Sequence, residues 1–447
     1  MKKFLVVLLS LGLLVAFGAT ASAADVTFGG SYYVVGVYND NANLKASDAS
    51  NSRAFFYQRL RLQPVFKIAE GLTLTARMDA MEKQWGQTNW KSVTAVDGDN
   101  TNSRRNGAVG STQKIQENFE WERGYVTFKT AIGQFDVGYM SAAAWGTVFG
   151  DSEDTKPRIK WTLPMGPLTL LAIYEKRFEA DASLVPGYYG KADADYDAYY
   201  LAAVYAFKGG NAGVLYGYLA NNATRLAATP SRMKLHLLEP YVKATFGPVY
   251  VEAEVDYFFG TLTEFDNVAG ASDIKRDGWT AYALAKVNMG PAYFGGQVGW
   301  SAGWDGTGTT NKLGGGGGTD WNPALILMND ELATWSGTSS GTQIGANASN
   351  SGKANMLLWN VFGGFNPSPK LNLEMAFTSA AADKVAANWD KEMGMEVDVK
   401  ASYKIYDNLT YMVGAGYLWT GDYFKRGVST ASVGNDYILM NRLTLSF

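Results

Sequence analysis

Four arginines recur in segments that alternate apolar and polar residues in the first third of the chain. Arg59 and Arg61 stand two residues apart, so both point to one face of an extended segment. Arg77 and Arg123 occupy the same polar positions in two later segments. Guanidinium groups bind carboxylates and phosphates through paired hydrogen bonds. A row of them is therefore suited to steering anionic or dipolar solutes.

A second charged group follows in segment 142–154, which is small, then aromatic, then acidic. Its acids are Asp151, Glu153 and Asp154. Carboxylates that face arginines across a water-filled space create a field that orients dipolar solutes and sets an ionic preference. This chemistry requires elements that hold the two groups on opposite sides of a lumen.

The elements that carry these charges alternate residue by residue. In the segment that holds Arg59, the apolar residues Leu60, Leu62 and Phe66 occupy the other face. Segments 249–259 and 393–404 alternate in the same way. An apolar face and a polar face indicate strands that lie between lipid and water. Segments 168–177 and 211–220 are apolar on both faces, so the pattern does not show which of their faces points to the lumen.

Short turns and long polar segments follow one another along the whole chain. Short turns fall at 69–71, 130–131, 164–167, 208–210, 247–248, 290–291, 366–369 and 407–408. Long segments fall near 39–52, 86–117, 142–156, 181–194, 221–231, 264–276, 305–353, 380–391 and 422–434. This rhythm predicts an all-β transmembrane antiparallel β-barrel of about 18 strands, with about 16 as the alternative, short periplasmic turns and long extracellular loops. The competing interpretation is a soluble β-sandwich or solenoid.

A barrel of this size leaves an aqueous channel in its centre. In general bacterial porins the third long loop folds inward and places acids opposite wall arginines, and segment 142–154 is third in order. We therefore expect a pore constriction formed by Arg59, Arg61, Arg77, Arg123, Asp151, Glu153 and Asp154. The alternative is a solvated surface loop, with the arginines paired locally to Asp79 and Glu122. Segment 321–335 of the longest loop is expected either to pack at the loop mouth or to form part of a plug.

The two ends of the chain predict export and membrane assembly. Residues 1–23 have a basic start, an apolar run and small residues, which is typical of a cleaved signal peptide. The remaining 24–447 are expected to form one barrel domain. The last strand alternates and ends on Phe447, which resembles the assembly signal of outer-membrane barrel proteins. We expect the barrel-assembly machinery to be a partner.

Composition excludes several classes of function. The chain has no Cys, so disulfides and thiolate chemistry are absent, and its net charge of −3 argues against nucleic acid as a partner. The single histidine, His236, has no Ser or acid arranged around it as in a hydrolase triad. Segment 97–100 starts like a calcium loop but lacks the later Gly and Glu. No enzyme, cofactor or metal is predicted.

Segments 53–61, 69–72 and 85–86, together with 122–126 and 133–138, resemble the homotrimeric outer-membrane porins of Desulfovibrio-type bacteria. The resemblance covers the first third of the chain and beyond it only the architecture. It implies a trimeric diffusion pore for small hydrophilic solutes.

The expected function is a porin of the cell outer membrane, in contact with outer-membrane lipid and lipopolysaccharide. Two alternatives remain open. One is a channel selective for a sugar or an organic acid, and the other is a sheath around an electron-transfer partner.

Overall fold

The computed structural model describes residues 25–42, 44, 52–86, 120–152, 154–179, 194–226, 228–336 and 353–447. The predicted signal peptide lies outside these residues. The first strands are β1 (Asp25–Asn39), β2 (Arg53–Ala69), β3 (Leu72–Gln84), β4 (Glu120–Thr130), β5 (Gly133–Ala142), β6 (Asp154–Met165), β7 (Leu168–Phe178), β8 (Tyr196–Phe207) and β9 (Gly210–Asn221). The later strands are β10 (Ser231–Phe246), β11 (Val249–Phe265), β12 (Ile274–Met289), β13 (Ala292–Ser301), β14 (Thr310–Asn311), β15 (Met356–Ser368), β16 (Leu371–Ala382), β17 (Glu392–Tyr406), β18 (Leu409–Thr420) and β19 (Asp436–Ser446).

Three short helices complete the described elements: η4 (Ala223–Leu226), α3 (Asp330–Ser336) and η5 (Asp422–Lys425). Within the described part of the chain, no helix is long and apolar enough to cross a membrane.

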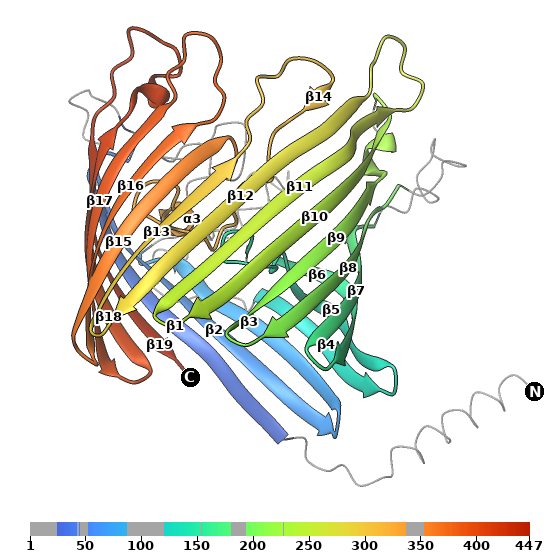
Figure 1. Ribbon diagram of the computed structural model, residues 1–447, viewed down its shortest axis with the longest axis horizontal. Helices are drawn as coiled ribbons and strands as arrows, with labels where there is room; N and C mark the ends of the chain where they lie inside the picture. The colour runs from blue at the N-terminus through green and yellow to red at the C-terminus, as the bar shows by residue number, and fades with distance from the viewer. Residues whose placement is uncertain are drawn as a thin grey trace, which may run out of the picture.

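The strands form a closed antiparallel barrel of 18 strands, as predicted, and the count of 16 is wrong. Each strand pairs with its neighbour in sequence, and β1 pairs with β19 to close the ring (Figure 1). The short β14 lies outside this ring and pairs in parallel with β12. Closure matters because each open sheet edge would leave backbone donors and acceptors without partners in lipid.

The closing contact continues to the last residue. The Phe447 N–H donates to the Gly30 carbonyl oxygen at 3.1 Å, and the Gly30 N–H donates to the Phe447 carbonyl oxygen at 2.8 Å. A Cβ atom on Gly30 would lie 2.8 Å from the Phe447 ring and 2.4 Å from the Arg61 carbonyl oxygen. Glycine at this position therefore allows β1, β2 and the chain end to approach one another closely.

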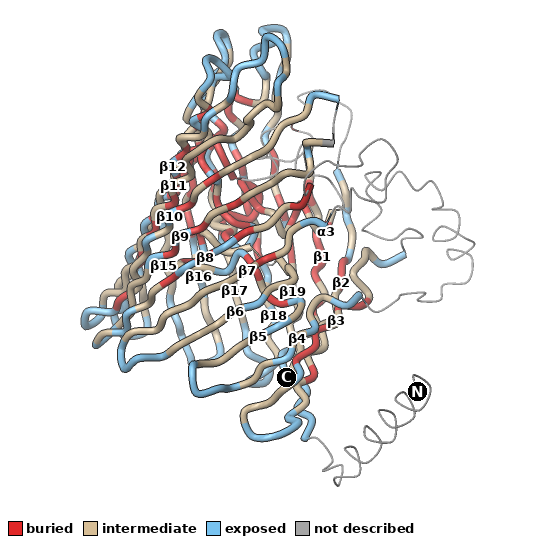
Figure 2. Tube along the Cα trace, turned by 90° about the vertical axis from the view of Figure 1, so that its right-hand side faces the viewer, coloured by how far each residue is buried: buried red, intermediate tan, exposed pale blue. Residues whose placement is uncertain are grey.

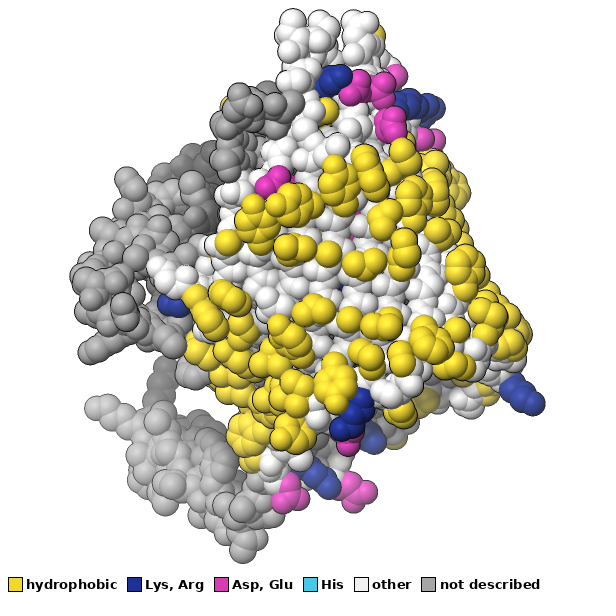
Figure 3. Space-filling view, turned by 90° about the vertical axis from the view of Figure 1, so that its left-hand side faces the viewer, with side chains coloured by type: hydrophobic (Ala, Val, Ile, Leu, Met, Phe, Trp, Pro, Cys, Tyr) yellow, Lys and Arg dark blue, Asp and Glu magenta, His cyan; other side chains and the backbone are white. Residues whose placement is uncertain are grey.

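The outer wall is apolar, and the alternation seen in the sequence explains it. On β16 to β18, exposed side chains such as Leu373, Met375, Val399 and Val413 occupy every second position. Figure 3 shows this band on one face, with acidic and basic side chains gathered toward its two ends. Burying such a surface in lipid is favourable by roughly 25 cal/mol per Å².

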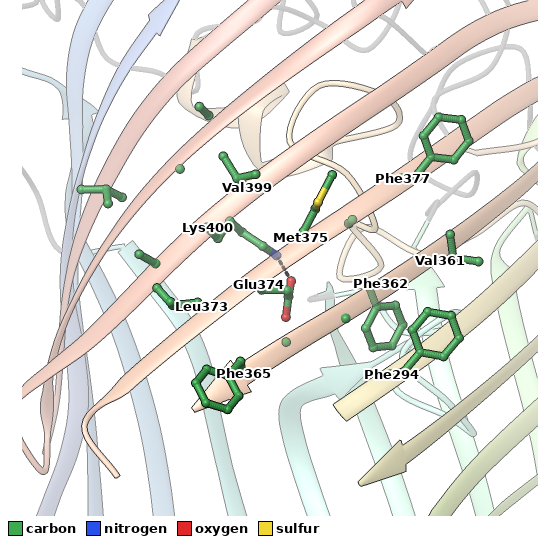
Figure 4. Close-up of a pocket in the computed structure, with 17 residues that line it drawn as sticks. Phe294, Val361, Phe362, Phe365, Leu373, Glu374, Met375, Phe377, Val399 and Lys400 are labelled. Atoms are coloured by element: carbon green, nitrogen blue, oxygen red, sulfur yellow. Dashed lines mark ion pairs between the residues drawn. The ribbon is translucent and has the colours of Figure 1, made fainter. Parts of the chain in front are cut away.

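An outward groove of about 890 Å³ interrupts this face over β13 to β18. Its lining is mainly apolar and includes Phe294, Phe365 and Met375 (Figure 4). Lys400 and Glu374, paired at 2.6 Å, alternate with the outward residues and so belong to the inner face of the wall. The groove faces away from the lumen and is not part of the candidate pore.

Most of the inner wall is charged or polar. Its buried carboxylates include Glu175 of β7, Glu254 of β11 and Glu396 of β17. Along β8 to β10, by contrast, a buried cluster of Ala198, Tyr200, Ala202, Leu215, Leu219, Leu235 and Leu237 faces inward, with Leu171 and Ile173 of β7 packed against it. This cluster explains why segments 168–177 and 211–220 are apolar on both faces.

Candidate pore constriction

The third loop lies between β5 and β6, and its residues 143–152 lie inside the barrel against another part of the wall. The Trp145 indole N–H donates to the Glu239 carbonyl oxygen of β10 at 2.9 Å. Phe149 is fully buried and stacks on Tyr282 of β12, with 4.9 Å between ring centroids. The inward fold of the loop was predicted, but the wall that it contacts was not.

Backbone amides of the third loop meet an acidic part of that wall. The Thr147 N–H donates to the Glu254 carboxylate on β11 at 2.5 Å, and the Lys243 ammonium of β10 donates to the Gly146 carbonyl oxygen at 2.6 Å. Gly146 has a φ of +73°, and a Cβ atom there would lie 2.4 Å from the Glu254 carboxylate. Only glycine satisfies both the left-handed backbone and this approach.

In the seventh loop, between β13 and β15, residues 317–336 also turn inward. Three consecutive backbone amides donate to carboxylates of β17: Leu325 to Asp398 at 3.2 Å, and Ile326 and Leu327 to Glu396 at 2.8 Å and 2.7 Å. Leu327 is fully buried, and Ile326 is 2% exposed. These three hydrogen bonds anchor the loop on β17.

Helix α3 continues the seventh loop across the lumen. Its Asn329 cap accepts the Leu332 N–H at 2.9 Å. Glu331 pairs with Arg442 of β19 at 3.1 Å. Gln84 of β3 donates its side-chain amide to the Trp335 carbonyl oxygen at 2.8 Å. The loop therefore spans from β13 to the first strands of the barrel, with α3 beside β1 (Figure 2). Segment 321–335, expected either at the loop mouth or as part of a plug, is bonded to inward side chains of the wall.

A buried lysine holds the shape of the seventh loop. Lys353 is 2% exposed, pairs with Asp330 at 2.6 Å and donates to the carbonyl oxygens of Gly318 and Trp321. Burial lowers the pKa of its ammonium group, and the Asp330 carboxylate opposes that change. The Trp321 indole N–H donates to Gln297 of β13 at 2.8 Å. These bonds join the start of the loop, its end and the wall.

The two loops meet and form one body, called here the crossbar (residues 143–152 and 317–336). The Gly318 N–H donates to the Phe149 carbonyl oxygen at 2.6 Å, and the Asp320 N–H donates to the Asp151 carbonyl oxygen at 3.2 Å. The Phe149 and Trp321 rings meet edge to face at 4.9 Å. The crossbar contacts the inner wall at β10, β11, β12, β13, β17, β19, β1 and β3.

The predicted arginines lie on the inner faces of β2, β3 and β4, where alternation placed them. Arg61 pairs with Asp79 at 2.5 Å, and Arg59 lies 3.9 Å from Asp79 and 3.7 Å from Glu82. Arg77 is 2% exposed and pairs with Glu122 at 3.3 Å. Arg77 also stands directly opposite Arg123 in the β3–β4 register. The local pairing with Asp79 and Glu122, one of the two alternatives, is present.

The predicted acids lie in different places. Asp151 belongs to the crossbar, where burial first, and then the neighbouring Asp320 carboxylate, raise its pKa to about 6. Asp154 is the first residue of β6 and not part of the loop, and it pairs with Lys156 at 2.9 Å. Glu153 lies outside the described residues. The assignment of the four arginines and three acids to one constriction stays a prediction.

Sequence reasoning missed the carboxylates that anchor the loops, namely Glu254, Glu396 and Asp398. They were recognised as wet-face residues of their strands. Nothing in their spacing distinguishes a carboxylate that faces water from one that accepts loop amides. The one related feature of the sequence is the glycine pair Gly146 and Gly150. In the structure, a Cβ atom added to either glycine would lie within 2.4 Å of the Glu254 carboxylate.

His236 lies on the outward side of β10 within a row of aromatic rings. Its Nδ1 lies 2.7 Å from the Tyr216 hydroxyl, and its ring stacks on Phe259 at 5.1 Å. Among the residues that the structure describes, no group of three or more histidines and carboxylates is arranged to hold a metal. The calcium-like segment 97–100 lies outside those residues.

Comparisons with known proteins identify the fold. No family model matches the chain, and no curated protein matches its sequence. Among solved structures, Pseudomonas aeruginosa OccK2 (OpdF) in complex with glucuronate has a TM-score of 0.51 and 13% identity, covering 96% of this chain and 100% of that chain. Pseudomonas aeruginosa OpdQ has a TM-score of 0.54 and 13% identity over 95% and 97% of the two chains.

A BenF-like porin from Pseudomonas fluorescens has a TM-score of 0.51 and 13% identity, covering 95% of this chain and 98% of that chain. At this identity the likeness shows a shared outer-membrane porin fold. The resemblance to Desulfovibrio-type porins in particular stays a prediction.

Proposed function

We propose that this barrel is a passive channel of a bacterial outer membrane, which admits small hydrophilic solutes and ions. The observation that carries the proposal is a closed 18-strand ring with an apolar outer face and a charged inner face. Barrels of 16 to 18 strands enclose more space than inward side chains can fill, so water enters. The predicted signal peptide and the alternating wall support export to that membrane.

Conductance of the purified protein tests this function. The refolded protein, added to a planar lipid bilayer, should produce discrete current steps, and heat-denatured protein should produce none. A native barrel that inserts and passes no ions would contradict a diffusion channel.

The crossbar favours a second candidate, a channel selective for an organic acid or a sugar. It narrows the lumen beside a wall that carries Arg59, Arg61 and Arg77. The fold relative OccK2 was crystallised with glucuronate, a sugar that bears a carboxylate. If this candidate is correct, millimolar glucuronate should block single-channel current more strongly than glucose. Equal effects of the two sugars would favour the unselective channel.

The electron-transfer sheath remains the third alternative. A protein partner inside the barrel would need the space that Trp321, Leu327 and Trp335 occupy, and these side chains are almost fully buried. The structure therefore supports a solute channel more than a sheath. Sizeable ionic current through the purified protein would support the solute channel, and little or no current would support the sheath.

We also propose a homotrimer that is assembled by the barrel-assembly machinery and surrounded by outer-membrane lipid and lipopolysaccharide. The resemblance to homotrimeric porins supports the trimer, and the terminal Phe447 supports the machinery. Native mass spectrometry in detergent should give three copies per particle. A Phe447→Ala variant should reach the outer membrane at lower abundance than the wild type.

A further inference from the structure

The junction between the two inward loops contains a carboxylate in an unusual setting. Asp151 ends the third-loop part of the crossbar, and one of its carboxylate oxygens is buried without a hydrogen-bond partner. Its backbone carbonyl accepts the Asp320 N–H at 3.2 Å, so two acidic residues from different loops are held side by side. The adjacent Thr319 N–H donates to the Ser152 hydroxyl oxygen at 3.1 Å.

The charges around Asp151 come from three elements. From the seventh loop, Asp320 disfavours the ionised form of Asp151, and Lys353 is paired with Asp330 at 2.6 Å. From β11, Glu252 also disfavours the ionised form.

Two further groups of the wall face the same region. Glu254 of β11 accepts the Thr147 N–H. Lys243 of β10 opposes the acids by favouring an ionised Asp151, and its ammonium also donates to Gly146 at 2.6 Å. Burial and the neighbouring acids outweigh this lysine, because the net result is a raised pKa of about 6.

We propose that the Asp151–Asp320 junction is an acid-closed gate, in which a proton on Asp151 keeps the third and seventh loops joined across the lumen. The inference rests on the proposed channel function. When Asp151 is ionised, two carboxylates held by adjacent backbone bonds repel each other in a partly buried site, which favours separation of the loops. Separation opens a gap between the two loops, while the third loop stays bonded to β10 and β11 through Trp145, Thr147 and Lys243.

The sign of the pH response follows from the raised pKa. Because the joined form raises the pKa of Asp151 from 3.8 to about 6, it binds the proton more tightly than the separated form. Acidification from pH 6 toward pH 3.8 therefore favours the joined form. Conductance is expected to fall on acidification, with the change lying between pH 6 and pH 3.8.

Single-channel recording from below pH 3.8 to above pH 6 tests the gate, because this range covers the pKa of Asp151 in both forms. Wild type should show the conductance change, and Asp151→Asn should hold the low-pH conductance throughout. Asp320→Asn should move the midpoint to lower pH, since it removes a charge that raises the pKa of Asp151. The control is Asp305→Asn in the same loop, where the exposed carboxylate bonds to Thr307, and it should behave like wild type.

A second readout does not depend on current. The chain has no Cys, so Val148→Cys and Thr319→Cys place one spin label on each loop without background labelling. Dipolar broadening of the electron spin resonance spectrum should be strong at low pH and weaker above the midpoint. The Asp151→Asn background should remove the difference.

The outcomes separate the gate from the channel. If Asp151→Asn retains the wild-type pH response, or if broadening is the same at every pH, the gate is wrong while channel function stands. If no variant conducts at any pH, the channel function is wrong, and the spectra alone decide whether the loops separate on ionisation of Asp151.

Discussion

At the scale of single residues, glycines and carboxylates determine where the inward loops lie. Gly146 and Gly150 bring the third loop close enough to Glu254 for the Thr147 N–H to bond with it. Glu396 performs the same role for the seventh loop through two amides. In both places a carboxylate that would otherwise be hydrated is satisfied by backbone donors, which offsets the cost of removing it from water.

Replacing Gly146 with alanine is expected to dislodge the third loop. The added Cβ atom would lie 2.4 Å from the Glu254 carboxylate, and the φ of +73° would be strained. We expect higher single-channel conductance in Gly146→Ala. Gly270→Ala is the matched control, because its φ is +77° but nothing lies within 4 Å of the added atom. Equal conductance in the two variants would mean that the contact with Glu254 does not hold the loop.

Glu396→Gln is expected to loosen the seventh loop without unfolding the barrel. A glutamine offers one acceptor oxygen, so one of the Ile326 and Leu327 amides would face a donor. A buried amide without an acceptor costs about 1–3 kcal/mol. Current noise from loop movement should increase, as measured by open-channel recording. Glu374→Gln, on the inner face of β16 and paired with Lys400, is the control and should leave the noise unchanged.

The side of the wall on which most charged residues lie was predictable, because it depends only on neighbouring residues in the sequence. The side on which Arg59, Arg61 and Arg77 lie follows from the two-residue period of a strand. Asp79, the partner of Arg59 and Arg61, is on the neighbouring strand of the same hairpin. Contacts such as Thr147 with Glu254 join residues that are far apart in sequence, and no local period encodes them.

At the scale of elements, the positions of the strands, short turns and long loops were predicted closely, but the paths of the inward loops were not. The sequence predicts a long loop near 380–391, and the structure ends β16 at Ala382 and starts β17 at Glu392. The seventh loop contains a run of apolar residues, Leu325 to Met328, that is compatible with a helix, a plug or a surface patch. Its place is decided by carboxylates on β17, which only the closed barrel brings near it.

Removing the seventh-loop part of the crossbar is expected to widen the lumen. A variant in which residues 319–334 are replaced by a short Gly-Ser linker loses the buried side chains Trp321, Ile326 and Leu327. Its conductance should exceed that of the wild type severalfold, since pore current scales with open cross-section. The barrel should still fold, because its strand pairing does not involve these residues. Unchanged conductance would place the solute path away from the crossbar.

At the scale of the whole molecule, the closed ring predicts resistance to detergent. Every barrel strand has two paired neighbours, so partial opening exposes two edges at once. Unboiled protein in SDS should migrate differently from boiled protein, and its circular dichroism should be dominated by β-structure. A helical spectrum with identical migration would contradict the barrel.

The distribution of charge over the lumen predicts ion selectivity. Neutralising Asp151, Glu153 and Asp154 as Asn, Gln and Asn should shift selectivity toward anions, and neutralising Arg77 and Arg123 should shift it toward cations. Reversal potentials in a salt gradient at low ionic strength measure both shifts, because screening is weak there. Reversal potentials that stay constant in both variants would exclude these residues from the constriction.

The crossbar also has a mechanical consequence. A barrel wall is one strand layer thick, so a wide ring flattens easily when the surrounding bilayer presses on it from the side. The crossbar ties β11 to β17, β19 and β3 through Glu254, Glu396, Arg442 and Gln84, so it resists flattening of the ring from within. The cross-section of the pore is therefore set by a few bonds inside it as well as by the number of its strands.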